Sequence, residues 1–376
     1  MGKNKKNKVY LVNDDDKRII GTLKAVFAVM VVFIHANFSS INMATGSVTF
    51  DFPKWFTMAK TILSDAIPKC AVPGFFIMAS VLLFKREFDW KKNVLKKART
   101  LMIPYFIINT FWILFYACAQ MVPSVSVFFS NPDKIVANWS WVEYLDAYLG
   151  TGVGSGVHLI YAPLWFVEHL FVLNIISPVI KMIIDKIPVI YGVAIICLLV
   201  FDVNFNMFFL NNVSLFYFSL GYYLVKYGIH FSDVKNIDYR IITPLYIAVT
   251  VLNMLTLGNE RFASVKDLAQ IIIGLLWWAH TAIYLSGLEG VPNAVLKTLE
   301  KYNFIIYIFH YNSITILQKL LFKLLPNNLV CIVAEYFISA IIMIVLCIVL
   351  AIFMERFMPR IFSLLIGDRD KKVKAQ

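Results

Sequence analysis

Long apolar runs, separated by short polar clusters, follow one another along almost the whole chain. Most of them approach the ~20 residues that an α-helix needs to cross a bilayer core. The pattern therefore predicts an all-α integral membrane protein, a bundle of about ten transmembrane helices. The predicted spans are Ile19–Phe38, Ile67–Phe84, Leu101–Met121, Leu159–Ile180, Ile187–Phe201, Met207–Val225, Ile241–Leu257, Leu268–Leu288, Tyr302–Leu325 and Leu329–Phe353.

The composition agrees with a membrane protein. Hydrophobic residues make up 60% of the 376 positions, charged residues make up only 15%, and the mean hydropathy is +0.72. This leaves too little polar surface for an ordinary soluble protein. The net charge of +12 is also found in nucleic-acid-binding proteins, but here the basic residues lie in short clusters between apolar runs, as membrane topology predicts. We expect the lipid bilayer as a partner and no nucleic acid.

Lysine and arginine residues are distributed unevenly over the segments between the spans. With the N-terminus inside, the predicted cytoplasmic segments hold 26 of them and the predicted external loops hold 6. Because cytoplasmic loops retain positive charge, both termini are predicted to be cytoplasmic. Residues 1–18 form a basic N-terminal segment, residues 19–356 a single polytopic membrane domain, and residues 357–376 a basic C-terminal tail. The long external loops are Ser39–Ala66 and Val122–His158.

Lys24 and His35 are ionisable residues within the first predicted span. Eleven steps of about 100° bring a helix back to nearly the same azimuth, so both side chains lie on one face, separated by roughly 16 Å of rise. Ionisable groups at membrane depth usually face a protein interior or a wet cavity. A histidine exchanges a proton near neutral pH, which suits His35 to general-base chemistry on a hydroxyl. A base near the outer end and a cation near the inner end suit a reaction whose two substrates arrive from opposite sides.

Six segments, in order along the chain, resemble the acyltransferase family 3 of membrane O-acyltransferases. In the first, a basic residue and a histidine are separated by ten residues. The matching strings are LKAVFAVMVVFIH (Leu23–His35), VPGFFIMASVLLF (Val72–Phe84), KKARTLMIPY (Lys96–Tyr105), PLWFVEHLFVL (Pro163–Leu173), LFYFSLGYYL (Leu215–Leu224) and NFIIYIFHYNSI (Asn303–Ile314). Two positions depart from the family pattern. Lys24 stands where many members carry arginine, although a lysine at this position is familiar in the branch that resembles fucose and exopolysaccharide O-acetylases. Ala79–Ser80 stands where relatives usually have Ser-Gly.

The resemblance implies an enzyme of the bacterial cytoplasmic (inner) membrane. Such an enzyme transfers an acyl group, usually acetyl from acetyl-CoA, to a hydroxyl of an extracytoplasmic carbohydrate such as a surface polysaccharide or lipid-linked glycan, without a metal. By its position in the first motif, His35 would be the catalytic base. The other candidates are Glu168 to orient His35 or bind sugar hydroxyls, Lys24 and Arg99 to pair with the CoA phosphates, and Trp165, Tyr307 and His310 to bind substrate.

Each of these residues also has a structural interpretation. His35 could be hydrogen-bonded between helices, and Lys24 could extend its side chain toward the cytoplasm. Glu168 and His169 are adjacent in sequence, so they point about 100° apart and cannot share a face. At most one of them is expected in a common site with His35.

Two other functions are compatible with the same polar stripe. A transporter could export a glycan, a lipid-linked precursor or a small polar solute; two related halves with paired, interrupted spans would support this, and no such halves are evident. An inactive sensor or scaffold is the third alternative, and the presence of both Lys24 and His35 favours an enzyme over it. The motifs leave open the acceptor, the choice between acetyl, succinyl and longer acyl groups, the choice between a covalent acyl-enzyme and direct transfer, and the oligomeric state.

Overall fold

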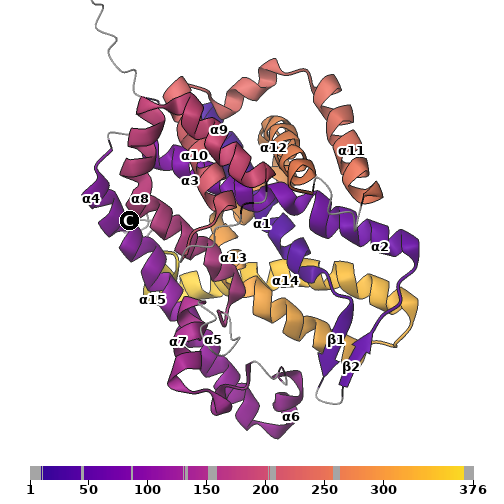
Figure 1. The fold of residues 1–376 in the computed structure, drawn as a ribbon. Coiled ribbons are helices and arrows are strands. Elements are labelled where there is room, and N and C mark those ends of the chain that lie inside the picture. The colour runs from indigo at the N-terminus through magenta and orange to yellow at the C-terminus, as the bar shows by residue number, and fades with distance from the viewer. Residues whose placement is uncertain are drawn as a thin grey trace, which may run out of the picture. The chain divides into compact units, whose positions relative to one another are not determined.

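The computed structural model describes residues 10, 12–43, 46–85, 88–129, 131, 134–150, 159–201, 203, 209–256 and 263–367. These residues are mostly helical (Figure 1). The chain divides into two compact units, each described here by itself. The first unit comprises residues 1–27, 69–97 and 169–300, and the second comprises residues 28–68, 98–168 and 301–376.

Three helices contribute to both units: α1 (Asp14–Ala36), α8 (Trp165–Lys186) and α13 (Gly290–Leu324). The first unit further contains α3 (Ala71–Phe84), α4 (Trp90–Lys97), α9 (Pro188–Val200), α10 (Asn212–Tyr227), the 3-10 segment η8 (Phe231–Asn236), α11 (Tyr239–Leu255) and α12 (Ala263–Ser286). The strands of the second unit are β1 (Ser40–Met43) and β2 (Gly46–Thr49). Its further α-helices are α2 (Lys54–Thr61), α5 (Ile103–Met121), α6 (Pro123–Ser126), α7 (Trp141–Leu149), α14 (Leu329–Phe357) and α15 (Pro359–Leu365). It also contains the π-helical turns η1 (Ile62–Ala66) and η3 (Ala98–Met102) and the 3-10 turns η4 (Val127–Phe129), η6 (Val136–Asn138) and η7 (Ala162–Leu164). The short 3-10 turn η2 (Pro68–Cys70) joins the two.

Each predicted span overlaps a helix. Met207, Phe208 and Leu257, at the ends of two predicted spans, lie outside the described residues. Among the described residues, six helical stretches are long and apolar enough to cross a membrane: 14–36, 54–84, 90–121, 162–186, 263–286 and 329–357. Helices α9 and α11 are apolar but shorter, and α10 and α13 carry the two remaining predicted spans. These observations support the predicted all-α, multi-pass class. The ten crossings and the cytoplasmic location of both termini stay predictions.

The segment Ser39–Ala66, predicted to be a loop, is largely ordered into secondary structure. Strands β1 and β2 pair antiparallel, with Ser40 opposite Thr49. Helix α2 follows, and its buried residues Phe56 and Lys60 are four positions apart and therefore share one face. The loop prediction was wrong here because the prediction searched for apolar runs long enough to cross a bilayer. Four-residue strands and an eight-residue helix are too short to be found in that way.

The segment Val122–His158 contains α6 and α7, while its residues 151–158 lie outside the described residues. Helix α7 begins with a capping box in which the Ser140 backbone N–H donates to the Glu143 carboxylate at 2.5 Å. This hydrogen bonding from Ser140 lowers the pKa of Glu143. The helix ends at Gly150, whose φ of 61° is a left-handed conformation that glycine adopts without strain.

The predicted terminal segments overlap with ordered helices. Helix α1 begins at Asp14, within the predicted segment 1–18, and α15 lies within the predicted tail 357–376. Residues 1–9, 11 and 368–376 lie outside the described residues. The division into one membrane domain with two basic ends stays a prediction.

Helices α3 and α10 of the first unit pack closely at Gly221. A Cβ atom added to Gly221 would lie 2.6 Å from the Ile77 carbonyl oxygen and 2.6 Å from the Ser80 Cβ atom. Ser80 is fully buried. Gly221 on α10 is therefore the small residue that lets the two helices approach closely.

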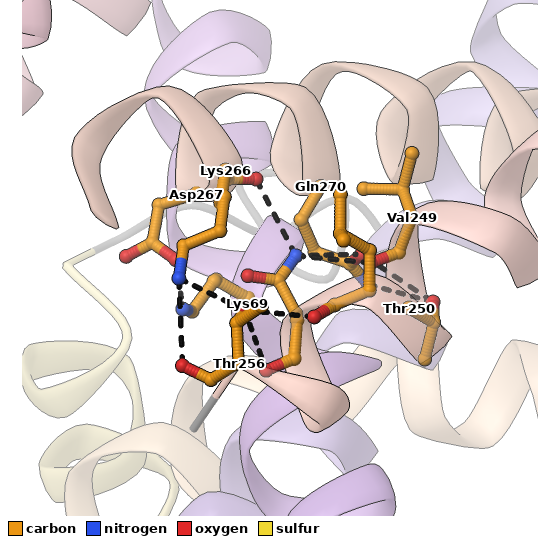
Figure 2. Close-up of polar contacts among 9 residues, drawn as sticks. Lys69, Val249, Thr250, Thr256, Lys266, Asp267 and Gln270 are labelled. Carbon is orange, nitrogen blue, oxygen red and sulfur yellow. Dashed lines mark hydrogen bonds and ion pairs between the residues drawn. The ribbon is translucent and has the colours of Figure 1, made fainter. Parts of the chain in front are cut away.

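A polar cluster joins α11 and α12 in the first unit (Figure 2). The buried Gln270 side chain donates to the Thr250 hydroxyl at 3.0 Å and accepts from the Asn253 amide at 3.4 Å. Lys266 donates to the Thr256 hydroxyl at 2.9 Å, and Lys69 pairs with Asp267. Because these groups hydrogen-bond one another, the cluster stabilises the packing of the helices, and this role accounts for its polar residues.

Candidate functional site

His35 lies in the last turn of α1, and three side chains of the second unit hold the end of that helix. The last carbonyls of a helix have no partner within the helix. Here Ser64 donates to the Phe33 carbonyl oxygen at 2.6 Å, and Gln318 donates to that of Ala36 at 2.8 Å. Lys60 donates to the Phe38 carbonyl oxygen at 2.7 Å, just beyond the helix. These contacts fix the helix end that carries His35.

The His35 imidazole lies against two rings of α13. Its centroid is 5.2 Å from that of His310 and 4.8 Å from that of Tyr311, with the Tyr311 ring nearly perpendicular at 83°. His35 is partly exposed, whereas His310 is fully buried. Among the described residues no hydrogen bond to a His35 ring nitrogen is found, so both nitrogens are open to a ligand.

The tautomer of His310 follows from its hydrogen bonds. Its Nδ1 atom lies 2.9 Å from the Ile306 carbonyl oxygen and 2.9 Å from that of Tyr307. Carbonyl oxygens only accept, so Nδ1 carries the hydrogen and Nε2 is left as an acceptor. This Nε2 atom is buried and has no hydrogen-bond partner among the described residues. Its lone pair is therefore available in the site.

The segment 160–163 is fastened to the turn of α13 that carries His310. The Tyr161 hydroxyl donates to the Tyr307 carbonyl oxygen at 2.7 Å and accepts from the Tyr311 backbone N–H at 3.2 Å. In return, the Tyr307 hydroxyl donates to the Pro163 carbonyl oxygen at 2.5 Å. Asn312 donates from its amide to the Ile160 carbonyl oxygen at 3.2 Å. These hydrogen bonds hold residues 160–163 against α13.

Trp112 of α5 packs against the same segment, its ring stacked on that of Tyr161 at 5.9 Å with an interplanar angle of 16°. Its indole N–H is buried and, like His310 Nε2, has no partner among the described residues. Buried polar atoms without partners are rare and call for an explanation such as water or a ligand. Trp112 Nε1 and His310 Nε2 are two such atoms, and both residues contact Tyr161. They indicate a site that binds polar groups.

A cavity of about 190 Å³ adjoins this cluster through Tyr311. It is lined by β1, by Tyr116 of α5, by one face of α13 and by Phe128, Phe129, Asn131 and Lys134. The α13 residues include Asn312, Gln318 and Lys319. Tyr311 thus contacts His35 and also forms part of the cavity wall, so the cavity lies near His35, which is not itself one of the lining residues.

Glu168 has a different neighbour from the one expected. It is buried, and its carboxylate is hydrogen-bonded to the Tyr105 hydroxyl, which also contacts the Tyr148 carbonyl oxygen. No contact between Glu168 and His35 is found among the described residues. The adjacent His169 belongs to the first unit, where its Nδ1 lies 3.2 Å from the Ser214 hydroxyl.

The remaining predicted site residues are placed as follows. Tyr307 and His310 lie on adjacent turns of α13 beside Tyr161, and Trp165 is partly exposed at the start of α8. Arg99 is exposed in η3 of the second unit, and Lys24 is partly exposed on α1 in the first unit. The structure brings His35 together with His310. The roles of Glu168, Trp165, Lys24 and Arg99 stay predictions.

Several residues of the site were missed by the sequence interpretation. Tyr311 and Asn312 directly follow His310 in the motif NFIIYIFHYNSI, and this position could have identified them. Lys319 lies within a predicted span, and an ionisable residue at membrane depth is itself a functional signal. Tyr161 carried no signal, because a tyrosine next to an apolar run is common at a membrane interface.

No group of three or more histidine, cysteine, aspartate or glutamate side chains that could hold a metal ion is found among the described residues. The groups available near His35 are imidazoles, phenols, amides and amines. They suit proton transfer and hydrogen bonding to hydroxyl-bearing ligands.

Comparison with known proteins gives one family and one curated relative. The family profile described as an acyltransferase domain, acyltransferase 3, matches residues 18–355. The succinoglycan biosynthesis protein ExoH of Rhizobium meliloti (strain 1021) is 25% identical over 201 residues, which cover 51% of this chain and 50% of the relative. The chain thus matches about half the length of this curated relative. No solved structure shows a significant match.

Proposed function

Because the chain belongs to the acyltransferase 3 family, we propose that it transfers an acyl group from acyl-CoA to a hydroxyl of an extracytoplasmic carbohydrate. His35 is the general base of this reaction. The acceptor is a surface polysaccharide or a lipid-linked glycan, a proposal supported by the name of the relative ExoH, which refers to succinoglycan biosynthesis. Acetyl is the proposed acyl group.

The observation that carries this proposal is the environment of the His35 imidazole. Its ring nitrogens are open among the described residues, its position is held through the end of α1, and its ring adjoins the cavity through Tyr311. A general base needs an available lone pair, a fixed position and space for the hydroxyl that it deprotonates. These features of His35 support its proposed role as the base.

The proposed reaction is a direct transfer. His35 takes the proton of the acceptor hydroxyl while the hydroxyl oxygen attacks the thioester carbonyl carbon. The new C–O bond forms, the C–S bond breaks, and the imidazolium returns the proton to the leaving thiolate, so that the products are an ester and CoA. His310 Nε2, which is open among the described residues, accepts a hydrogen bond in the same site.

We propose that Lys24 and Arg99 bind the phosphates of acyl-CoA, on the basis of their positions in the motifs. Lys24 lies on the same helix as His35, and the roughly 16 Å of rise between them is of the order of the pantetheine arm of CoA. In the proposed topology, with both termini in the cytoplasm, Lys24 lies toward the side from which CoA arrives. Glu168 and Trp165 are proposed to contact substrate from α8.

Mass spectrometry of surface glycans tests the proposal. In cells that lack this protein, we expect the glycan to lose the mass of one acyl unit, and wild-type protein to restore it. His35→Ala is expected not to restore it, since general bases contribute about 10²- to 10⁴-fold to rate. His280→Ala, which changes a partly exposed histidine of the first unit, is the matched control and should restore it.

An experiment with purified protein in liposomes separates an enzyme from a transporter. If acyl-CoA is not consumed by purified protein while labelled glycan still crosses liposome membranes, the acyl-transfer proposal is wrong. An unaltered rate of transfer by the His35→Ala protein would instead remove the role given to His35 and leave the reaction in place.

A further inference from the structure

The cavity beside His35 is lined by two lysines, Lys134 and Lys319, and by no carboxylate among the described residues. Lys319 is only 8% exposed, and its amine donates to the Phe128 carbonyl oxygen at 2.8 Å. The Lys134 amine lies 3.3 Å from the Ile160 carbonyl oxygen and 3.4 Å from the Asn312 side-chain oxygen. Two cations therefore converge on one small space.

A buried amine is unfavourable unless an anion or several hydrogen bonds compensate for its lost hydration. No ion pair of Lys319 is found in the part of the chain that the structure describes. A carbonyl oxygen carries only a partial negative charge, so it compensates incompletely for the charge of Lys319. A bound anion would complete the compensation, through a charge-assisted hydrogen bond of the stronger kind.

The other walls of the cavity suit a sugar. Tyr116 and Tyr311 present aromatic rings, and Asn42, Asn312 and Thr315 present amide and hydroxyl groups. A volume of about 190 Å³, below the ~300–1,000 Å³ typical of sites for drug-sized ligands, suits a small ligand such as one sugar unit. A single charged sugar fits both the size and the lining of this cavity.

We propose that this cavity binds an acidic sugar unit of the acceptor glycan, with Lys319 and Lys134 contacting its carboxylate. This inference rests on the proposed function and adds a substrate class to it. Tyr311 is shared between the cavity and the His35 ring, so the bound unit lies next to the hydroxyl that is acylated. The enzyme therefore selects acidic over neutral glycans.

Direct binding to the full-length protein in lipid nanodiscs tests this selection without requiring turnover. The probes are sodium glucuronate and glucose, compared by isothermal titration or saturation-transfer nuclear magnetic resonance. We expect glucuronate to bind at least tenfold more tightly than glucose. Lys319→Met and Lys134→Met, which keep most of the side-chain volume, are expected to remove this preference and leave glucose binding unchanged.

Two further variants serve as controls. Lys319→Arg keeps the cation and should keep the preference. Lys323→Met removes the same charge one turn further along α13, from an exposed lysine that does not line the cavity, and should also keep it. Equal binding of glucuronate and glucose by wild-type protein, or an equal loss with Lys323→Met, overturns the proposal.

Transfer assays distinguish this inference from the proposed function. If glucuronate binds selectively through Lys319 but no glycan is acylated, the subsite stands and the proposed reaction is wrong. If neutral and acidic glycans are acylated equally well, the reaction stands and the subsite is wrong. If the lysine variants alter the preference between succinyl-CoA and acetyl-CoA instead, the carboxylate belongs to the donor, and the assignment to the acceptor is overturned.

Discussion

The imidazole rings of His35 and His310 lie 5.2 Å apart, centroid to centroid, at an interplanar angle of 43°. Carbonyl oxygens of α13 hold the Nδ1–H of His310, so Nε2 is its one open atom, whereas both nitrogens of His35 are open among the described residues. The two histidines therefore have different capacities within one site. His35 can take and release a proton with little change in other contacts, whereas His310 can accept a hydrogen bond without altering its anchor.

Substitutions can test the roles of the two ring nitrogens of His310, Nδ1 and Nε2, separately. An asparagine amide can replace the Nδ1–H donor and reach the carbonyl oxygens of Ile306 and Tyr307, but it has no atom at the Nε2 position. We expect His310→Asn to keep the unfolding temperature near that of wild type and to lower the rate of acyl transfer at least tenfold. Thermal unfolding and steady-state kinetics of purified protein measure the two effects.

His310→Gln provides the matched comparison, since a glutamine amide extends toward the Nε2 position. We expect it to retain more transfer activity than His310→Asn. Wild-type activity in the asparagine variant would mean that Nε2 of His310 takes no part in the reaction.

The bond between Gln318 and the end of α1 is predicted to support both stability and activity. Gln318→Leu leaves the Ala36 carbonyl oxygen without its partner, and an unsatisfied buried group costs about 1–3 kcal/mol. Because this bond holds the turn that carries His35, we expect kcat to fall as well. Unfolding is measured by denaturant titration, and kcat is measured below the unfolding temperature.

Gln270→Leu is the control for this effect, because Gln270 is also buried and hydrogen-bonded but belongs to the α11–α12 cluster of the first unit (Figure 2). It should lower stability by a similar amount and leave kcat close to that of wild type. A similar loss of kcat in both variants would show that activity follows stability in general and not the position of His35.

Close packing of α3 and α10 makes Gly221 sensitive to a single methyl group. In Gly221→Ala the new Cβ would be 2.6 Å from a backbone carbonyl oxygen, which cannot move aside as a flexible side chain can. We expect a destabilisation of about 1–3 kcal/mol, the range found for overpacked cores. In Gly287→Ala the nearest atom is 3.5 Å away, so that variant should unfold like wild type. Equal stability of both variants contradicts the close contact.

The predicted orientation can be tested by cysteine labelling. Leu95 on α4 and Trp141 on α7 are similarly exposed, at 73% and 76%, and belong to predicted cytoplasmic and external segments respectively. In a variant without the native cysteines, we expect Trp141→Cys to react with a membrane-impermeant maleimide on intact cells. Leu95→Cys should react only after the cells are permeabilised. The opposite labelling pattern would place both termini outside.

The sequence interpretation was most accurate where a property depends on a local run of residues. The first predicted span, Ile19–Phe38, overlaps most of α1 (Asp14–Ala36), and the family predicted from the motifs is the one whose profile matches residues 18–355. Glu168 was expected to approach His35, but its observed partner is Tyr105. Neighbours of this kind depend on how helices rotate against each other, which hydrophobic periodicity does not specify.

The sequence by itself determined that this chain is a helical membrane protein of the acyltransferase 3 family, since apolar runs of bilayer length and the order of its motifs are properties of the linear chain. Only the tertiary structure decided which polar groups meet. It placed Gln318 on the end of α1, Tyr161 across a turn of α13, and Lys319 in a cavity beside Tyr311. The physical reason is that these bonds join residues distant in sequence, and their partners are chosen by side-chain packing and by the need to satisfy buried polar groups.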